Sequence, residues 1–290
     1  MLTLSSVDLN TWIAALLWPL TRILGLIAAA PVLGNSAVPN SSKIMLAVML
    51  AAIIGPTVPA LPAADPLSLA GLLILAQELL VGLGMGFSMR VVFAAIEMAG
   101  EISSLTMGLG FATFFDPQSH GRSSAIGQLL ALLASMVFLA ANVHLVLLAA
   151  LAESFVSLPV SAAPLSGAGF KHLADWGGKI FASGLQISLP IVAALLLTNV
   201  ALGILTRAAP QLNLFGIGFP ITLGVGMLVI AMAMPYMEGP LERLFLEAIE
   251  TSRKLPRSWA DRTRPALLPV RPAKPAGPAP VPVPRQPQDR

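Results

Sequence analysis

The chain has 290 residues, of which 56% are hydrophobic and only 11% are charged. Because an average soluble domain is about 25% charged, this composition predicts an integral membrane protein. Cysteine is absent, which excludes disulfides, thiolate metal sites and cysteine nucleophiles. His120, His144 and His172 lie far apart in the sequence and without helical spacing, so we expect no histidine metal site.

The net charge of +3 combines two unlike parts of the sequence. Residues 1–250 contain eight Lys or Arg and twelve Asp or Glu, a net charge of −4. Residues 251–290 contain nine Lys or Arg and two Asp, a net charge of +7. The basic character therefore belongs to a C-terminal tail and does not indicate binding to nucleic acid.

Six hydrophobic runs predict an all-α membrane protein whose helices are broken by proline and glycine. They cover residues 12–33, 43–61, 67–100, 125–152, 180–206 and 214–237. The first run contains Pro19 and Arg22, and Pro31 and Gly34 mark its end. The third run would be roughly 50 Å long as one helix, against a hydrocarbon core of about 30 Å, so it either tilts and protrudes or bends.

After the last run, residues 238–250 are typical of a short amphipathic helix, and the tail at residues 251–290 follows. Ten prolines from Pro256 onward predict a disordered, polyproline-like tail. We therefore divide the chain into a hydrophobic helical domain, residues 1–250, and this tail. The positive-inside rule places the tail in the cytoplasm, where it serves solubility and topology or, alternatively, docks on anionic membrane lipid.

Ionisable side chains within hydrophobic runs are costly unless they face protein or water. Arg22 and Glu78 lie in different runs, and charge economy suggests that they pair across two helices. Arg90, Glu97 and Glu101 share one helix face, because they are seven and four residues apart. These groups are interpreted either as a protein-facing pair or helix-end groups, or as parts of a proton relay. The relay lacks further acidic or histidine groups in neighbouring runs.

Three closely spaced glycines lie in the middle of the third hydrophobic run, at Gly82, Gly84 and Gly86. Missing side chains let helix backbones approach one another closely. Packing at an interface is the ordinary interpretation, and a hinge is the alternative. Gly224 and Gly226 in the last run allow the same two interpretations.

The loop at residues 107–121 is the candidate gate of the molecule. Its gate residues are Met107, Gly108, Gly110, Phe111, Phe114, Phe115 and Asp116. The methionine and phenylalanines are bulky apolar groups that can seal a pore by dewetting and still be displaced. The glycines let the backbone turn where other residues could not. The alternative is an ordinary loop that packs against its own helices.

Polar and helix-breaking residues gather at residues 207–220, between the last two hydrophobic runs. The residues of interest there are Arg207, Pro210, Gln211, Asn213, Phe215 and Pro220. Backbone groups freed by proline, and a side chain as polar as asparagine, must find partners in protein or in a water-filled cavity. The segment predicts a buried interface or a conduit. We assign assembly or packing roles to it and to Arg22, Glu78, Gly82 and Gly86.

This segment also carries a family resemblance. Residues 209–211, Asn213 and residues 215–220 (Phe-Gly-Ile-Gly-Phe-Pro) strongly resemble a motif of the FliR family, a core membrane subunit of the flagellar type III protein export gate. The resemblance covers most of residues 12–250. Other matching positions are Arg22, Pro31, Gly34, Val38-Pro39, Lys43, Glu78, Gly82, Gly86, Gly100, Asp116-Pro117, Ser154-Phe155, Asn199, Gly203 and Arg207. The Pro-rich basic extension departs from the family pattern.

The resemblance implies a role in protein export. The chain would join FliP-like and FliQ-like subunits in a hetero-oligomeric, helical assembly in the bacterial inner membrane, at the flagellar basal body, with FlhA-like and FlhB-like partners. The conduit would pass unfolded flagellar proteins outward. The loop at residues 107–121 would be a plug inside it, together with methionines of FliP-like subunits. In this family, hydrophobic helices can also lie above the bilayer, buried against other subunits.

Catalytic signatures are missing from the sequence, including a phosphate-binding loop, a zinc-protease helix and a serine nucleophile motif. We therefore expect no enzyme activity, no cofactor and no nucleic-acid partner. Two other functions stay open, a structural scaffold and a small-molecule secondary transporter whose broken helices bind substrate. An inverted repeat would favour the transporter, but residues 207–220 have no counterpart of like composition in the first half of the chain.

Overall fold

The computed structural model describes residues 6–59, 62, 64–111, 124–209 and 214–261. All regular elements in these ranges are helical. The long helices are α1 (Ser6–Ala29), α2 (Asn40–Ile54), α3 (Leu69–Thr106), α5 (Ala125–Ala140), α6 (Val143–Ser157), α7 (Gly167–Gly177), α8 (Lys179–Ala208) and α9 (Phe219–Ala260). Short turns of helix are η1 (Gly55–Thr57), η2 (Leu109–Phe111) and η4 (Leu214–Gly218).

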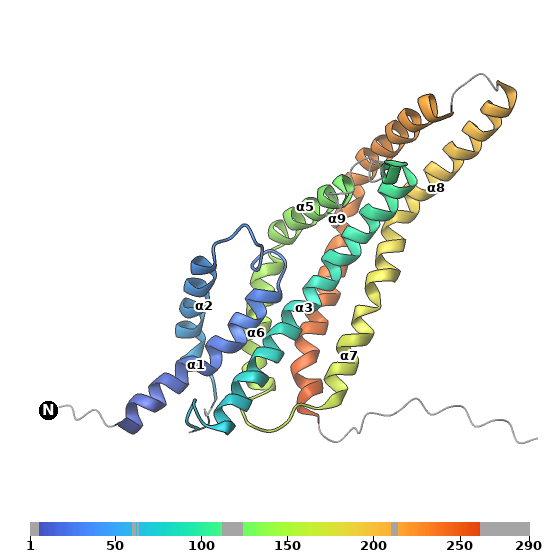
Figure 1. Ribbon diagram of the computed structural model, residues 1–290. Helices are drawn as coiled ribbons and strands as arrows, with labels where there is room; N and C mark the ends of the chain where they lie inside the picture. The colour runs from blue at the N-terminus through green and yellow to red at the C-terminus, as the bar shows by residue number, and fades with distance from the viewer. Residues whose placement is uncertain (1–5, 60–61, 63, 112–123, 210–213, 262–290) are drawn as a thin grey trace, which may run out of the picture.

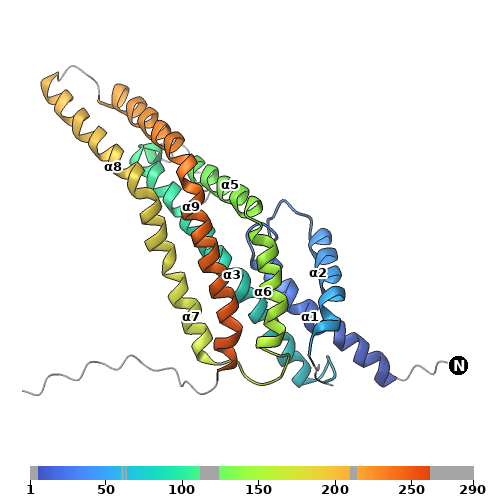
Figure 2. The same cartoon turned by 180° about the vertical axis from the view of Figure 1, so that it is seen from behind.

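Helix α3 is the centre of the fold. It packs against α1, α5, α8 and α9, and α2 lies outside α1 (Figure 1). Seen from behind, α6 continues downward from α5 and packs beside the lower part of α9 (Figure 2). Almost all of the buried apolar side chains form one continuous core among these helices.

The third hydrophobic run forms a single helix. Ser68 caps it by accepting a hydrogen bond from the Gly71 backbone N–H at 3.1 Å. The 38 residues of α3 span roughly 57 Å at 1.5 Å per residue. The run is one continuous helix without a break at Gly82, Gly84 and Gly86.

The fourth run differs from the expectation of one span. Helices α5 and α6 meet at 67°. Asn142 forms the corner with a left-handed φ of 54°, a conformation that asparagine tolerates better than most residues. The run is therefore a broken span or a re-entrant pair.

Four helical stretches in the described residues are long and apolar enough to cross a membrane, or five if the bent pair counts as one span. The four stretches are Asn40–Thr57, Leu69–Thr106, Gly167–Ala208 and Gly216–Ala260. The first predicted run contributes only the shorter apolar helix Ala15–Ala29. The expected count of six spans is thus not confirmed, because only Ala15–Ala29 of the 24-residue helix α1 is assessed and the fourth run is bent.

Helix α9 is longer than the sequence suggests. Its 42 residues include the expected helix at 238–250 and continue to Ala260, with Pro235, Pro240 and Pro256 inside it. The first ten residues assigned to the tail therefore belong to this helix or its end. Residues 262–290 lie outside the described ranges.

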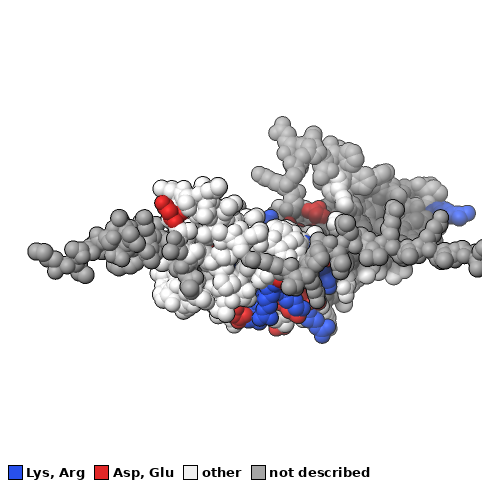
Figure 3. Space-filling model, turned by 90° about the horizontal axis from the view of Figure 1, so that it is seen from below, with Lys and Arg blue, Asp and Glu red and all other residues white. Residues whose placement is uncertain are grey.

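The two ends of the molecule differ. At the upper end in Figure 1, α3 and α8 end and α5 and α9 begin. At the lower end, α3 begins and α9 ends, and charged side chains gather over part of this end when it is seen from below (Figure 3). Exposed ion pairs among the described residues include Lys179–Glu247 and Arg253–Glu153, at 3.0 and 3.2 Å.

Candidate gate and helix-packing sites

A buried ion pair joins α1 to α3 near the lower end. The Nε and Nη2 atoms of Arg22 donate to the two carboxylate oxygens of Glu78 at 2.6 and 2.9 Å. Arg22 is fully buried and Glu78 is 3% exposed. The pairing expected from charge economy is therefore present.

The same guanidinium also holds α6. Its Nη1 donates to the Ser154 hydroxyl at 3.0 Å, and its Nη2 donates to the Leu158 carbonyl at 2.9 Å. The ring of Phe155 lies 4.2 Å from the guanidinium carbon. A buried charge is tolerated when its hydrogen-bonding groups are satisfied in this way. Arg22 is thus the point at which three helices are tied together.

Helices α1 and α3 approach closely enough that side chains are excluded between them. A Cβ atom added at Gly82 would lie 2.0 Å from the Arg22 carbonyl oxygen, and one at Gly86 would lie 2.7 Å from the Leu26 carbonyl oxygen. On the facing helix, a Cβ at Gly25 would lie 2.6 Å from the Leu79 carbonyl oxygen. Packing is therefore the role that these glycines have within the chain.

The first residue of the candidate gate is fixed to α9. Met107 is fully buried, and its side chain lies against Gly226. The hydroxyl of Thr222 donates to the Met107 carbonyl at 3.0 Å. Gly108 follows with φ of 89°, a conformation that L side chains rarely adopt, so the chain turns away from α3 at this point.

The far end of the loop is fixed as well. The Glu101 carboxylate accepts a hydrogen bond from the backbone N–H of Ser124, where α5 begins. A Cβ at Gly100 would lie 2.4 Å from the Gly127 Cα, so α3 and α5 are in close backbone contact there. Both ends of the segment at residues 112–123 therefore start from packed helices.

Other predicted gate and assembly residues fall elsewhere. Gly110 and Phe111 lie in the short helix η2, but the side chain of Phe111 is not among those described. Phe215 lies in η4, also with an undescribed side chain. The predicted residues outside the described ranges are Phe114, Phe115, Asp116, Pro210, Gln211 and Asn213.

At the edges of the polar segment, Arg207 and Pro220 are both exposed. Arg207 lies in the last turn of α8 and Pro220 in the first turn of α9, so the segment at residues 207–220 joins the two helices along the chain. Arg90 and Glu97 occur in none of the ion pairs formed among the described residues. The structure therefore does not bring the α3 charges together into a relay.

Sequence reasoning missed Trp259. Trp259 is 1% exposed, and its ring lies between α3 and α7. A Cβ atom added at Gly84 of α3 would lie 2.5 Å from this ring, and one added at Gly169 of α7 would lie 2.2 Å from it. The Trp259 carbonyl accepts from the Ser166 N–H at 3.0 Å, which ties the loop before α7 to the end of α9.

A signal for this packing was present in the sequence. Buried residues recur along α9 at positions 241, 245, 248, 252, 255 and 259, with the alternating spacing of three and four that one helix face requires. Pro256 and the basic residues obscured the pattern.

The sequence of this chain is similar to those of known bacterial proteins. Residues 13–248 match the model of a family described as bacterial export proteins, family 1. The flagellar biosynthetic protein FliR of Pectobacterium carotovorum is 43% identical over 250 residues, which cover 86% of this chain and 95% of that protein. The FliR proteins of Escherichia coli K12 and Bacillus subtilis 168 are 41% and 32% identical, over 85% and 81% of this chain and 94% and 91% of their own lengths.

The match to the family model covers most of the chain, and similar relatives occur in distantly related bacteria. The resemblance found in the motif at residues 209–220 is therefore confirmed over residues 13–248. The chain belongs to the FliR family of bacterial export proteins.

Proposed function

We propose that this chain is a membrane subunit of the flagellar type III protein export gate. In this role it assembles with FliP-like and FliQ-like subunits, in contact with FlhA-like and FlhB-like proteins. Together the subunits form the channel through which unfolded flagellar proteins leave the cell. The observation that carries the proposal is the attachment of Met107 to α9, because it anchors the candidate gate beside the polar segment that marks the family.

The gate itself is assigned to residues 108–121. Met107 and Ser124 are held by Thr222 and Glu101, so the loop between them can be displaced without unfolding the helices that carry it. Its phenylalanines close the channel by excluding water between substrates. The chain has no enzymatic role, and energy comes from the proton-motive force or a partner ATPase.

Exposed apolar side chains on α8 and α9 supply the contact surface for the other subunits. Large apolar groups exposed on these two helices include Leu185, Leu189, Leu196, Leu197, Val200, Ile204, Ile221, Met227, Leu228 and Met232. Neighbouring helices or lipid must cover a surface of this kind. Arg207, which is exposed in the last turn of α8, then finds its polar partner in an adjacent subunit.

The charged lower end faces the cytoplasm in this proposal, and the chain lies in the inner membrane at the flagellar basal body. Basic side chains are favoured on the cytoplasmic side of a membrane. This orientation places the C-terminal tail inside the cell and the gate loop toward the opposite side. The family assignment does not favour a small-molecule transporter.

The test is to purify the chain, tagged at residue 290, after co-expression with the neighbouring membrane genes of its own genome. Co-purification of FliP-like and FliQ-like chains in one complex is expected. Replacing residues 112–121 by a short Gly-Ser linker should then leave the complex assembled but raise its ion conductance in a bilayer. An assembled complex with unchanged conductance would refute the gate, and loss of assembly would instead favour a scaffold role.

A further inference from the structure

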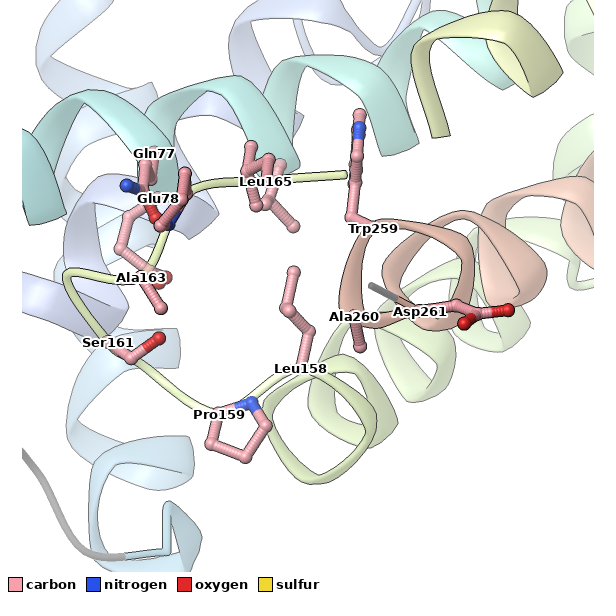
Figure 4. Close-up of a pocket in the computed structure, with 12 residues that line it drawn as sticks. Gln77, Glu78, Leu158, Pro159, Ser161, Ala163, Leu165, Trp259, Ala260 and Asp261 are labelled. Atoms are coloured by element: carbon pink, nitrogen blue, oxygen red, sulfur yellow. The ribbon is translucent and has the colours of Figure 1, made fainter. Parts of the chain in front are cut away.

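A cavity of about 480 Å³ lies at the lower end of the molecule, beside the buried ion pair. It is bordered by α3, by the loop between α6 and α7, and by the end of α9 (Figure 4). Leu158 and Leu165 extend into the hollow, and Ser161 lies on its rim. Its volume falls in the range of about 300–1,000 Å³ that is usual for ligand pockets.

The walls of this cavity are held in place. The side-chain amide of Gln77 is oriented with its nitrogen toward the loop between α6 and α7. In this orientation it donates hydrogen bonds to the carbonyls of Ser161 and Ala163 at 3.2 and 2.8 Å. The Ser166 N–H bonds to the Trp259 carbonyl at 3.0 Å. The loop therefore cannot collapse inward without breaking these bonds, and Leu158 and Leu165 stay only partly buried.

The chain itself leaves the described region at this cavity, because Asp261 is one of the residues that line it. The following residues, 262–271, read Arg-Thr-Arg-Pro-Ala-Leu-Leu-Pro-Val-Arg. Leu267 and Leu268 are the only leucines after residue 261. Six residues of extended polyproline-like chain span roughly 19 Å at 3.1 Å per residue, so the two leucines can turn back and reach the hollow.

We propose that residues 265–270 of the tail fold back into this cavity and place Leu267 and Leu268 against Leu158 and Leu165. Proline on either side of the leucines restricts the free segment to few conformations, which lowers the entropy lost on docking. Because Glu78 also borders the cavity, the docked segment excludes water from one side of the Arg22–Glu78 pair.

The tail is a better occupant than a partner common to the family. The family match ends at residue 248, and the Pectobacterium relative is covered over 95% of its length by 250 of the 290 residues of this chain. The Pectobacterium relative therefore has no counterpart to most of the unmatched residues. An occupant supplied by this chain is consistent with an extension that this relative lacks.

The test uses the absence of cysteine, because Ser161→Cys introduces a single thiol on the cavity rim. Its rate of maleimide labelling is measured in purified membranes for the full chain and for chains ended after Pro272 and after Asp261. The full chain and the chain ended after Pro272 should label at least about fivefold more slowly than the chain ended after Asp261. The reason is that the thiol is protected in the fraction of molecules whose tail is docked in the cavity. Leu267→Asp with Leu268→Asp in the full chain should label as fast as the shortest chain.

Ala174→Cys is the matched control, because this exposed residue lies on α7 and does not line the cavity. Its labelling should be the same at all three chain lengths, which also reports that shortening leaves the fold intact. Equal labelling of Ser161→Cys in the longest and shortest chains would overturn the proposal. Fast labelling of Ser161→Cys in the chain ended after Pro272 would also overturn the proposal. The segment that occupies the cavity would then lie after residue 272 and not at residues 265–270.

Discussion

The side chain of Met107 occupies the space that a side chain on Gly226 would need. A Cβ atom at Gly226 would lie 2.5 Å from the Met107 Cε and 2.9 Å from its Sδ. Thr222, one turn before Gly226, holds the Met107 carbonyl. Met107 is therefore the fixed base of the proposed gate, and the part that can move begins at Gly108.

Replacing Gly226 by valine should loosen this base. Extra methyl groups in a packed site cost about 1–3 kcal/mol, and Met107 is the group that has to move. We expect Gly226→Val to lower the thermal unfolding midpoint of the purified complex and to raise its ion leak. Gly224→Val is the matched control, because no atom lies within 4 Å of a Cβ there. Equal leak in the two variants would show that the Met107 contact does not hold the gate.

Removing one partner of the Arg22–Glu78 pair should be more damaging than removing both. Arg22→Met leaves Glu78 buried without a counter-charge, which typically costs about 3–5 kcal/mol. The double variant Arg22→Met with Glu78→Met should recover part of this loss, as measured by unfolding in detergent.

The exposed pair Lys179–Glu247, with side chains 46% and 47% exposed, is the matched control. Its coupling energy in the same double-mutant cycle should stay below about 1 kcal/mol. Additive single effects at Arg22 and Glu78 would contradict the role of the buried pair as a tie between helices.

Gly82→Ala should separate α1 from α3. The added methyl would lie 2.0 Å from the Arg22 carbonyl oxygen, and the backbone there cannot yield as a flexible side chain would. We expect lower amounts of folded protein in the membrane and a lower unfolding midpoint. Gly203→Ala on α8, where nothing lies within 4 Å, should be neutral or stabilise by about 0.5–1 kcal/mol. The reverse order of stability would contradict the packing role.

Sequence reasoning found features that depend on composition and charge. Arg22 is the one charged residue of its apolar run and Glu78 lies within another, so charge economy could pair the two without a structure. Glycines spaced along one run likewise indicated close helix contact at Gly82.

Features set by tertiary packing could not be found in this way. The corner at Asn142 interrupts a run without proline, where hydrophobicity alone reads as one helix. Met107 was assigned to the candidate gate loop, and its burial against α9 depends on Gly226, more than a hundred residues away in the sequence. The end of α9 was misplaced because proline and basic residues favour a tail, whereas the packing of Trp259 keeps the helix intact past Pro256.

The last buried side chain at the end of the described fold is Trp259, eleven residues beyond the family match. A chain ended after Glu250 should lose the contacts of Trp259 with α3 and α7, whereas a chain ended after Asp261 keeps every described contact. We expect the first to be degraded or purified in low amounts and the second to fold like the full chain. Trp259→Ala in the full chain should cost about 3–5 kcal/mol in unfolding free energy. If the chain ended after Glu250 unfolded at the same midpoint as the full chain, α9 beyond residue 250 would be dispensable, and the clasp of Trp259 between Gly84 and Gly169 would carry no stability.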